Sequence, residues 1–290
     1  MTKKIFTLNS PSYVLRIKNS IFCVVMGAVL CLICLAGEAR ELPAHKPAAG
    51  GVAIFDLGPY ATEPTVLYQG NAVATVKIDD HWFAVVGIPL SAEVGAEIVV
   101  VVKVDDWISF SYVERVLENS YGEEKLEVAS KHVTLSPSNL ERHQTEKTRI
   151  DSVKRTFTDK KPTSFKLRMP VEGRASSTFG YRRIYNGESR SPHSGMDIAA
   201  PKGTAVFAAG PGLIVDVGEY FFSGKMITID HGSGFLTLYA HLSDADISIG
   251  DIVSHTSLIG RVGASGRVTG PHLHFGVLLN GVSVNPDLFL

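Results

Sequence analysis

The chain has 290 residues, 20% of them charged, and a formal net charge of −1. This length allows two modest domains with buried cores, and the near-neutral charge argues against a nucleic-acid partner. All three cysteines, Cys23, Cys31 and Cys34, lie within the first 39 residues. The rest of the chain therefore has neither a disulfide framework nor a cysteine nucleophile.

Residues 1–39 have the pattern of a secretory signal peptide. A basic start precedes an apolar run over residues 21–36, and small residues at positions 37 and 39 precede Arg40. The run is 16 residues long, shorter than the roughly 20 that a transmembrane helix needs. We therefore expect export and removal of this segment. The alternative is an uncleaved N-terminal anchor, which would be the chain's link to a membrane.

Residues 40–135 are expected to form a β-rich N-terminal domain after a short lead-in. Asp79-Asp80 and Asp105-Asp106 mark two hairpins. The continuous apolar run over residues 98–102 predicts a strand that is covered on both faces and lies away from a sheet edge. We predict a small β-barrel or sandwich. Its strands are expected over residues 52–55, 72–78, 82–88, 97–104 and 107–113.

Residues 136–164 are expected to form a helical linker. Ser138 and Glu141 have the spacing of a capping box, and Pro137 suits a first turn. Asp151 can pair with Arg155 one turn later. The heptads are not sustained, so the helix is expected to pack on a domain rather than form a coiled coil. Its sparse apolar stripe consists of Leu140, Ile150, Val153 and Phe157.

Residues 165–290 are expected to form a third region of strands and turns, punctuated by glycines. The pattern predicts an antiparallel β-sheet with long loops around a groove. The strands are expected over residues 205–208, 212–217, 226–230, 235–239, 258–262 and 273–279.

Two short motifs in this last region carry candidate metal ligands. His193 and Asp197 lie four residues apart, where neighbouring prolines and a glycine disfavour a helix, so the start of a strand or an ordered loop is expected. His272 and His274 are separated by one apolar residue in a β-rich run. Alternate side chains of a strand share a face, so these two imidazoles should point the same way.

Two imidazoles and one carboxylate make up the three protein ligands of a catalytic zinc ion, with the fourth position left for water. Two histidines then remain for proton transfer, namely His241 and the histidine of the pair at 272 and 274 that does not bind metal. The same donor set also binds iron(II) in oxygenases. The additional histidines and the expected export favour zinc.

The order of these motifs resembles the lysostaphin-type zinc metallopeptidases. His193 and Asp197 are followed by Tyr-Ala-His-Leu at 239–242 and by Pro-His-Leu-His-Phe at 271–275. The resemblance extends to residues 177–182, 250–253 and 260–263 and covers about the last 125 residues.

The resemblance implies a role for each residue of the site. The zinc ligands would be His193, Asp197 and His274, with His241 and His272 assisting catalysis. His272 is expected to be the general base, with His241 orienting water or stabilising the oxyanion, although the two roles can be exchanged.

The function implied is that of an exported zinc metalloendopeptidase of the periplasm. It would hydrolyse the peptide cross-links of peptidoglycan, binding the stem peptides and using a metal-activated water. The alternative is a non-catalytic activator or regulator of other cell-wall hydrolases. Some relatives have this role after losing ligands, but all five expected residues are present in this chain.

Two further expectations concern regions around the site. Arg182 occupies the last position of a Phe-Gly-x-Arg motif, where its guanidinium would bind a substrate carboxylate. An internal ion pair is the alternative. Residues 82–90 resemble part of the β-rich domain that precedes the catalytic domain in some Gram-negative relatives. That domain is expected to be a structural spacer, or else to control access to the zinc cleft.

Overall fold

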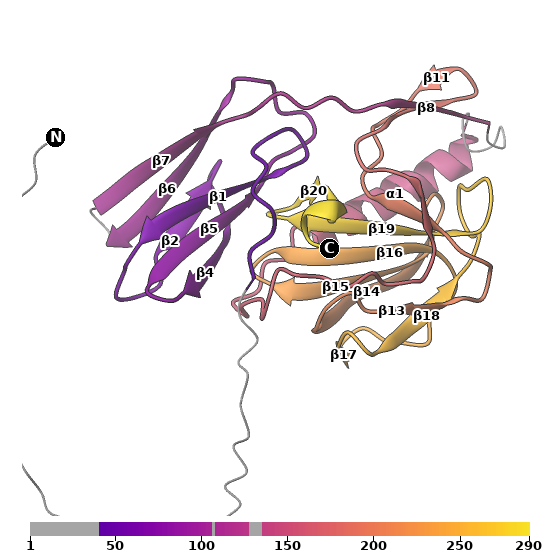
Figure 1. Ribbon diagram of the computed structural model, residues 1–290. Coiled ribbons are helices and arrows are strands. Elements are labelled where there is room, and N and C mark those ends of the chain that lie inside the picture. The colour runs from indigo at the N-terminus through magenta and orange to yellow at the C-terminus, as the bar shows by residue number, and fades with distance from the viewer. Residues whose placement is uncertain (1–40, 106–107, 128–134) are drawn as a thin grey trace, which may run out of the picture. The chain divides into compact units, whose positions relative to one another are not determined.

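The structure is a computed structural model that describes residues 41–105, 108–127 and 135–290. The expected signal peptide and the three cysteines lie outside the described residues. In the part of the chain that is described, no helix has the length and apolar character required to cross a membrane. The fold is mainly β, as predicted (Figure 1).

The N-terminal region is a sandwich of two antiparallel sheets. One sheet has the order β1 (Val52–Gly58), β5 (His81–Gly87) and β4 (Ala74–Ile78). The other has the order β3 (Asn71–Ala72), β2 (Thr65–Tyr68), β6 (Glu97–Asp105) and β7 (Ile108–Arg115). Phe55 and Val86 of the first sheet pack in one cluster with Ile98 and Val100 of the second. Of the two architectures predicted, the sandwich is the one formed.

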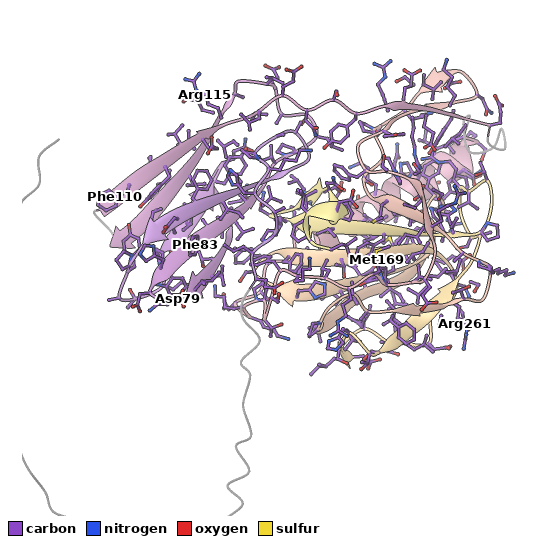
Figure 2. All side chains as sticks on the ribbon, viewed as in Figure 1. Asp79, Phe83, Phe110, Arg115, Met169 and Arg261 are labelled. Carbon is purple, nitrogen blue, oxygen red and sulfur yellow. The ribbon has the colours of Figure 1, made fainter. Side chains whose placement is uncertain are left out.

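Both predicted hairpins are present. β4 and β5 are joined through Asp79, which adopts φ +52° in the turn (Figure 2), and β6 pairs with β7. The prediction that the apolar run of β6 lies away from an edge is also confirmed, because β6 lies between β2 and β7.

The prediction that this run is covered on both faces is wrong. Ile98, Val100 and Val102 are fully buried, whereas Val99 on the other face is 37% exposed. The sheet that contains β6 is covered only on its inner face, so successive side chains of β6 alternate between core and solvent.

The linker helix α1 spans Pro137–Lys154. Its N-cap is Ser136, whose Oγ accepts a hydrogen bond from the Asn139 backbone N–H at 3.2 Å. The predicted capping box at Ser138 is therefore wrong. With Ser136 as N-cap, Pro137 occupies the first helical position, where its missing N–H costs no hydrogen bond.

Helix α1 is held mainly by polar contacts to the strand that it crosses. Arg149 donates to Asp216 of β14 (Gly212–Tyr220) at 2.6 Å. Glu146 accepts from the Phe221 backbone N–H at 2.7 Å. Of the predicted apolar stripe, Ile150 packs against a small buried cluster, while Leu140 is 45% exposed. The ion pair of Asp151 is made with Lys147 rather than with Arg155.

The C-terminal region is built on one large antiparallel sheet. Its six predicted strands are all present, and they correspond to β13, β14, β15, β16, β18 and β19. The main path of the sheet runs β17 (Ile252–Val253), β14, β15 (Gly224–Gly232), β16 (Phe235–Asp244), β19 (His272–Leu279), β12 (Met196–Ala199) and β9 (Arg174–Ser177). The remaining elements are β13 (Ala205–Phe207), β18 (Leu258–Val262), β20 (Val282–Val284) and the 3₁₀ helix η2 (Pro286–Leu288).

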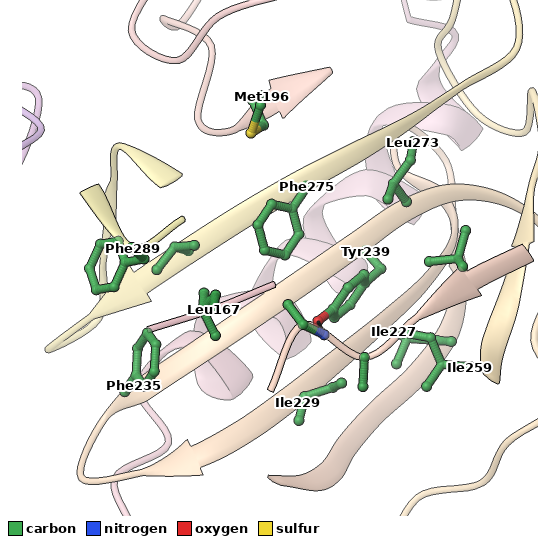
Figure 3. Packing of buried hydrophobic residues seen from close by; sticks show 14 of the residues in the cluster. Leu167, Met196, Ile227, Ile229, Phe235, Tyr239, Ile259, Leu273, Phe275 and Phe289 are labelled. Atoms are coloured by element: carbon green, nitrogen blue, oxygen red, sulfur yellow. Dashed lines mark hydrogen bonds between the residues drawn. The ribbon is translucent and has the colours of Figure 1, made fainter. Parts of the chain in front are cut away.

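One face of this sheet carries a continuous apolar core (Figure 3). The rings of Tyr239 and Phe275 have centroids 5.4 Å apart. The Tyr239 hydroxyl contacts the Thr237 hydroxyl and accepts from the Ala209 N–H. Tyr239 is therefore a core residue with a satisfied hydroxyl.

A strand absent from the prediction lies between the sandwich and helix α1 and pairs with the C-terminal region. β8 (Glu123–Leu126) runs parallel to β10 (Arg182–Tyr185), which pairs on its other edge with β11 (Glu188–Ser189). This small sheet precedes the segment that contains His193 and Asp197.

Candidate metal centre

Strand pairing brings the two ligand motifs together. Asp197 of β12 lies directly opposite His274 of β19 in the antiparallel register, so their side chains are neighbours on one face of the sheet. His193 lies in the loop that leads into β12. A Cβ at Gly195 would lie 2.4 Å from the Phe275 carbonyl oxygen and 2.8 Å from the His274 ring, so only glycine lets this loop approach the strand so closely.

The three side chains converge on one point. His193 Nε2 lies 3.0 Å from His274 Nδ1 and 3.0 Å from Asp197 Oδ1, and the latter two atoms are 2.9 Å apart. A tetrahedral zinc ion with bonds of about 2.0–2.1 Å separates its ligand atoms by about 3.3 Å. The triangle therefore has nearly the size that such an ion requires.

The protonation of the histidines also fits a cation. His193 Nδ1 lies 2.9 Å from the Thr178 carbonyl oxygen. A carbonyl oxygen can only accept, so Nδ1 carries the proton and Nε2 presents a lone pair. Burial lowers the pKa of His274 to about 4, against the attraction of Asp197. The His274 imidazole is thus neutral at pH 7, as a metal ligand must be.

Asp197 supplies the negative charge of the group. Burial alone would raise its pKa, but the adjacent imidazoles of His193 and His274 outweigh burial and hold the pKa far below its usual range. Three acceptor atoms directed at one point repel one another unless a cation lies between them. Two nitrogen ligands and one oxygen ligand make a set that suits zinc.

Arg183 braces the carboxylate from behind, a role that was not predicted from the sequence. Its Nη2 donates to Asp197 Oδ2 at 2.6 Å, which leaves Oδ1 directed at the histidines. Arg183 and Arg182 are adjacent on β10 and so point to opposite faces. Two neighbouring arginines on one strand were the available signal, since one of them had to face inward.

Arg182 faces the other way. Its side chain is 65% exposed and pairs with Glu123 at 3.1 Å, which matches the ion pair considered as the alternative to a substrate role. The substrate-binding role of Arg182 stays a prediction.

His272 and His241 complete the centre. His272 shares a face of β19 with His274, as predicted, and its Nε2 lies 3.8 Å from Asp197 Oδ1. The centroid of its ring is 4.9 Å from that of His241. His241 Nδ1 donates to the Ser265 carbonyl at 2.8 Å, and His272 Nδ1 donates to the Gly270 carbonyl at 2.9 Å. Each ring is thus fixed by the backbone, with an Nε2 lone pair left available.

A β-bulge aims His241 into the site. Opposite β16, Lys225 pairs with Leu242 and Ile227 pairs with Tyr239, so two residues of β16 face one residue of β15. His241 adopts φ +64°, a left-handed conformation that costs about 1 kcal/mol or more in a non-glycine residue. The bulge breaks the alternation of the strand. Tyr239 therefore lies in the core while His241 reaches the site, where burial lowers its pKa to about 3.

Two cavities of about 130 and 200 Å³ flank the centre. The smaller is lined by Asp197 and His272, and the larger by His193 and His274. Both are also lined by Arg183, Tyr185, His241 and Arg267.

The histidines outside the site have no partner spacing in the sequence, which predicts surface or turn positions for them. Among those that the structure describes, His231 contradicts this prediction. It lies on β15, is only 3% exposed, and contacts the Pro211 carbonyl and the Thr237 hydroxyl.

Comparison with protein families gives two matches. Residues 191–286 match the model of peptidase family M23. Residues 45–114 match the model of the N-terminal domain of peptidase family M23.

Similar proteins carry related names. The chain is 38% identical over 138 residues to the peptidoglycan DD-endopeptidase ShyA of Vibrio cholerae serotype O1, a match that covers 47% of this chain and 30% of ShyA. It is 43% identical over 122 residues to the DD-carboxypeptidase/endopeptidase Mpg of Neisseria meningitidis serogroup B, covering 42% of this chain and 28% of Mpg. The matched part is thus less than a third of either relative.

A solved structure is similar to most of this chain. It is described as a putative peptidase M23 from Pseudomonas aeruginosa, and it is 36% identical with a TM-score of 0.71. The match covers 84% of this chain and 95% of that structure.

Proposed function

The chain belongs to peptidase family M23, and from that premise we propose that it is a zinc-dependent endopeptidase that hydrolyses the peptide cross-links of peptidoglycan. The observation that carries the proposal is the triangle of His193, Asp197 and His274, with ligand atoms 2.9–3.0 Å apart. It is flanked by two further imidazoles whose Nδ1 atoms are anchored to backbone carbonyls.

The three atoms of the triangle would hold zinc. When bound, zinc lowers the pKa of a coordinated water and polarises the carbonyl of the peptide bond to be cut. Arg183 keeps Asp197 Oδ1 directed at the ion by holding Oδ2.

His272 is assigned as the general base. Its Nε2 faces Asp197 Oδ1 at 3.8 Å and would accept the proton of the attacking water, then deliver it to the leaving nitrogen. His241 is a poor base at neutral pH because its pKa is about 3. Its Nε2 lone pair would instead accept a hydrogen bond from that water and orient it.

The names of the relatives support peptidoglycan stem peptides as substrates. Such a substrate lies outside the cytoplasm, which agrees with the signal pattern of residues 1–39 and with action in the periplasm. The alternative function, a non-catalytic regulator, is disfavoured because every residue that the chemistry needs is in place around one point.

The test is digestion of purified peptidoglycan by the full chain, with mass spectrometry of the released fragments. Release of cross-link cleavage products should require zinc, stop with a chelator and return on zinc addition. His193→Ala should be inactive and depleted of zinc, whereas His255→Ala, a histidine that lines neither cavity of the site, should match the wild type. Stoichiometric zinc without any cleavage would favour the regulator, and bound iron would overturn the metal assignment.

A further inference from the structure

Arg267 lies in the loop between β18 and β19, beside the metal centre. Its guanidinium carbon is 4.6 Å from the centroid of the Tyr185 ring and 4.2 Å from that of the Phe222 ring. Such stacking holds a planar guanidinium by its faces and leaves the N–H groups at its edge directed outward. The side chain lines both cavities of the site.

The loop that carries Arg267 is fixed to the site at several points. The Arg267 backbone N–H donates to the Phe222 carbonyl at 2.8 Å. Ser265, two residues earlier, accepts the Nδ1 proton of His241 through its carbonyl. Gly266 has φ +77°, and a Cβ there would lie 2.4 Å from the Phe222 carbonyl oxygen. The orientation of Arg267 is therefore coupled to that of His241.

Helix α1 supports this arrangement from the other side. The His143 ring packs edge-on against the Phe222 ring, with centroids 4.8 Å apart. Phe222 is thus held between the helix and the Arg267 guanidinium. Little side-chain entropy remains for Arg267 to lose on binding a ligand.

Arg267 differs from the other arginines near the site in having no acidic partner. Arg183 pairs with Asp197 and Glu124, and Arg190 pairs with Glu188. Among the described residues, no carboxylate forms an ion pair with Arg267, and its side chain makes no hydrogen bond. A fixed, half-buried guanidinium with unused donors in a catalytic cavity is suited to binding an anionic group of the substrate in two-pronged fashion.

We propose that Arg267 binds the free carboxylate on the leaving-group side of the scissile bond. The inference rests on the proposed function and adds the substrate group that the site recognises. A bond between two D-centres leaves a carboxylate on the carbon attached to the scissile nitrogen. That carboxylate is the chain end in a carboxypeptidase reaction and a free side group in an endopeptidase reaction. One arginine placed beside this carbon would serve both reactions and would position the nitrogen near His272.

The test uses two synthetic cross-linked peptides that differ in one group. In one peptide the leaving D-centre bears a carboxylate, and in the other it bears a carboxamide. The zinc-loaded full chain should cleave the carboxylate peptide with a kcat/KM about 10- to 100-fold higher, the range expected for hydrogen bonds to a charged group. Arg267→Gln should remove this preference while leaving kcat/KM for the carboxamide peptide within about 3-fold.

Two further variants keep the result interpretable. Arg267→Lys retains the charge but not the planar pair of donors, so it should keep an intermediate preference. Arg182→Gln tests the other arginine, for which a substrate role was predicted, and it should keep the full preference if Arg267 binds the carboxylate. A preference lost in Arg182→Gln and kept in Arg267→Gln would overturn the inference in favour of Arg182.

A binding measurement separates recognition from turnover. Calorimetric titration of the inactive His272→Ala chain should give tighter binding of the carboxylate peptide by a similar factor, and the additional Arg267→Gln change should abolish the difference. If Arg267→Gln weakened binding of both peptides by the same factor, its role would be merely structural and the inference would be overturned. Failure of the wild type to cleave either peptide or peptidoglycan would instead overturn the proposed function.

Discussion

The two β regions of the chain differ in what they bury. Both have an apolar core between antiparallel strands, but in the described part of the sandwich the buried polar side chains are limited to Thr75. The C-terminal region buries nine, and these are Ser177, His193, Asp197, Asp216, Thr228, Asp230, His231, Ser233 and Thr237. Burying a polar group is unfavourable unless it is hydrogen-bonded or ion-paired. The larger number of buried polar side chains therefore shows that the C-terminal region depends on specific polar contacts.

Pairing explains why the fold tolerates most of these groups, while the buried Thr228 hydroxyl has no hydrogen-bond partner among the described residues. His193 and Asp197 belong to the candidate metal centre. Asp216 accepts from Arg149 and from the Tyr220 hydroxyl, which docks the linker helix. His231 lies between a backbone carbonyl and the Thr237 hydroxyl. The sandwich thus depends on hydrophobic burial. The C-terminal region adds polar contacts that position the candidate metal ligands and dock helix α1.

The largest effects should come from the histidines of the catalytic region. His272→Ala and His241→Ala are each expected to lower kcat/KM on a cross-linked peptide by about 10²–10⁴-fold, the usual contribution of a positioned base or acid. Both variants should keep near-stoichiometric zinc, measured by elemental analysis. Loss of zinc in either variant would contradict the assignment of His193, Asp197 and His274 as the ligands.

Truncation of a buried side chain in the sandwich should lower stability rather than remove catalysis. Ile98→Ala removes most of a fully buried side chain and should lower the free energy of unfolding by about 2–5 kcal/mol, with zinc content unchanged. The neighbouring Val99 is 37% exposed, so Val99→Ala should change the free energy by less than about 1 kcal/mol. Chemical denaturation of both variants measures the difference, and equal effects would contradict the one-faced burial of β6.

Acid should destabilise the C-terminal region through His231. Burial lowers the pKa of its imidazole from 6.5 to about 4. Between these two values the unfolded chain binds a proton that the folded chain does not, so the free energy of unfolding falls as the pH falls. The expected loss is on the order of 3 kcal/mol.

Replacing this histidine isolates its contribution from that of other titrating groups. His231→Gln keeps groups that can donate and accept hydrogen bonds but cannot titrate in this range. Between pH 7 and pH 4 its stability should therefore fall by less than that of the wild type. Identical pH profiles for both chains would exclude His231 as the source.

The smallest effect is expected at Glu124, where strand β8 meets the site. Glu124 of β8 accepts from the Ser177 hydroxyl at 3.0 Å and lines the smaller cavity. Its carboxylate would repel an anionic substrate, so Glu124→Ala should raise kcat/KM by a few fold. Glu123→Ala, at the exposed neighbouring position that pairs with Arg182, is the matched control. An unchanged or lower kcat/KM for Glu124→Ala would mean that Glu124 does not hinder substrate binding. The structural-spacer interpretation of the N-terminal domain would then be favoured over control of access to the cleft.

Much of the fold was predictable because its signals are local. Alternating apolar residues located the longer strands of both regions but missed short ones such as β2, β9 and β12, and the spacing of His272 and His274 correctly placed both side chains on one face. The N-cap was misassigned because two serines flank Pro137, and only the geometry of the first turn selects Ser136. The run at residues 98–102 was misread because composition alone does not reveal which faces a sandwich covers.

The sequence by itself determined the family resemblance, the positions of the longer strands and the five residues expected at the centre. Only the tertiary structure decided that Arg183 rather than Arg182 braces Asp197, that a bulge turns His241 away from the Tyr239 face, and that Arg267 is clamped beside the cavities. The physical reason is range. Periodicity reports on neighbours along the chain, whereas Glu124 and Ser177 are 53 residues apart, and contacts of that kind depend on register and loop packing that no local pattern encodes.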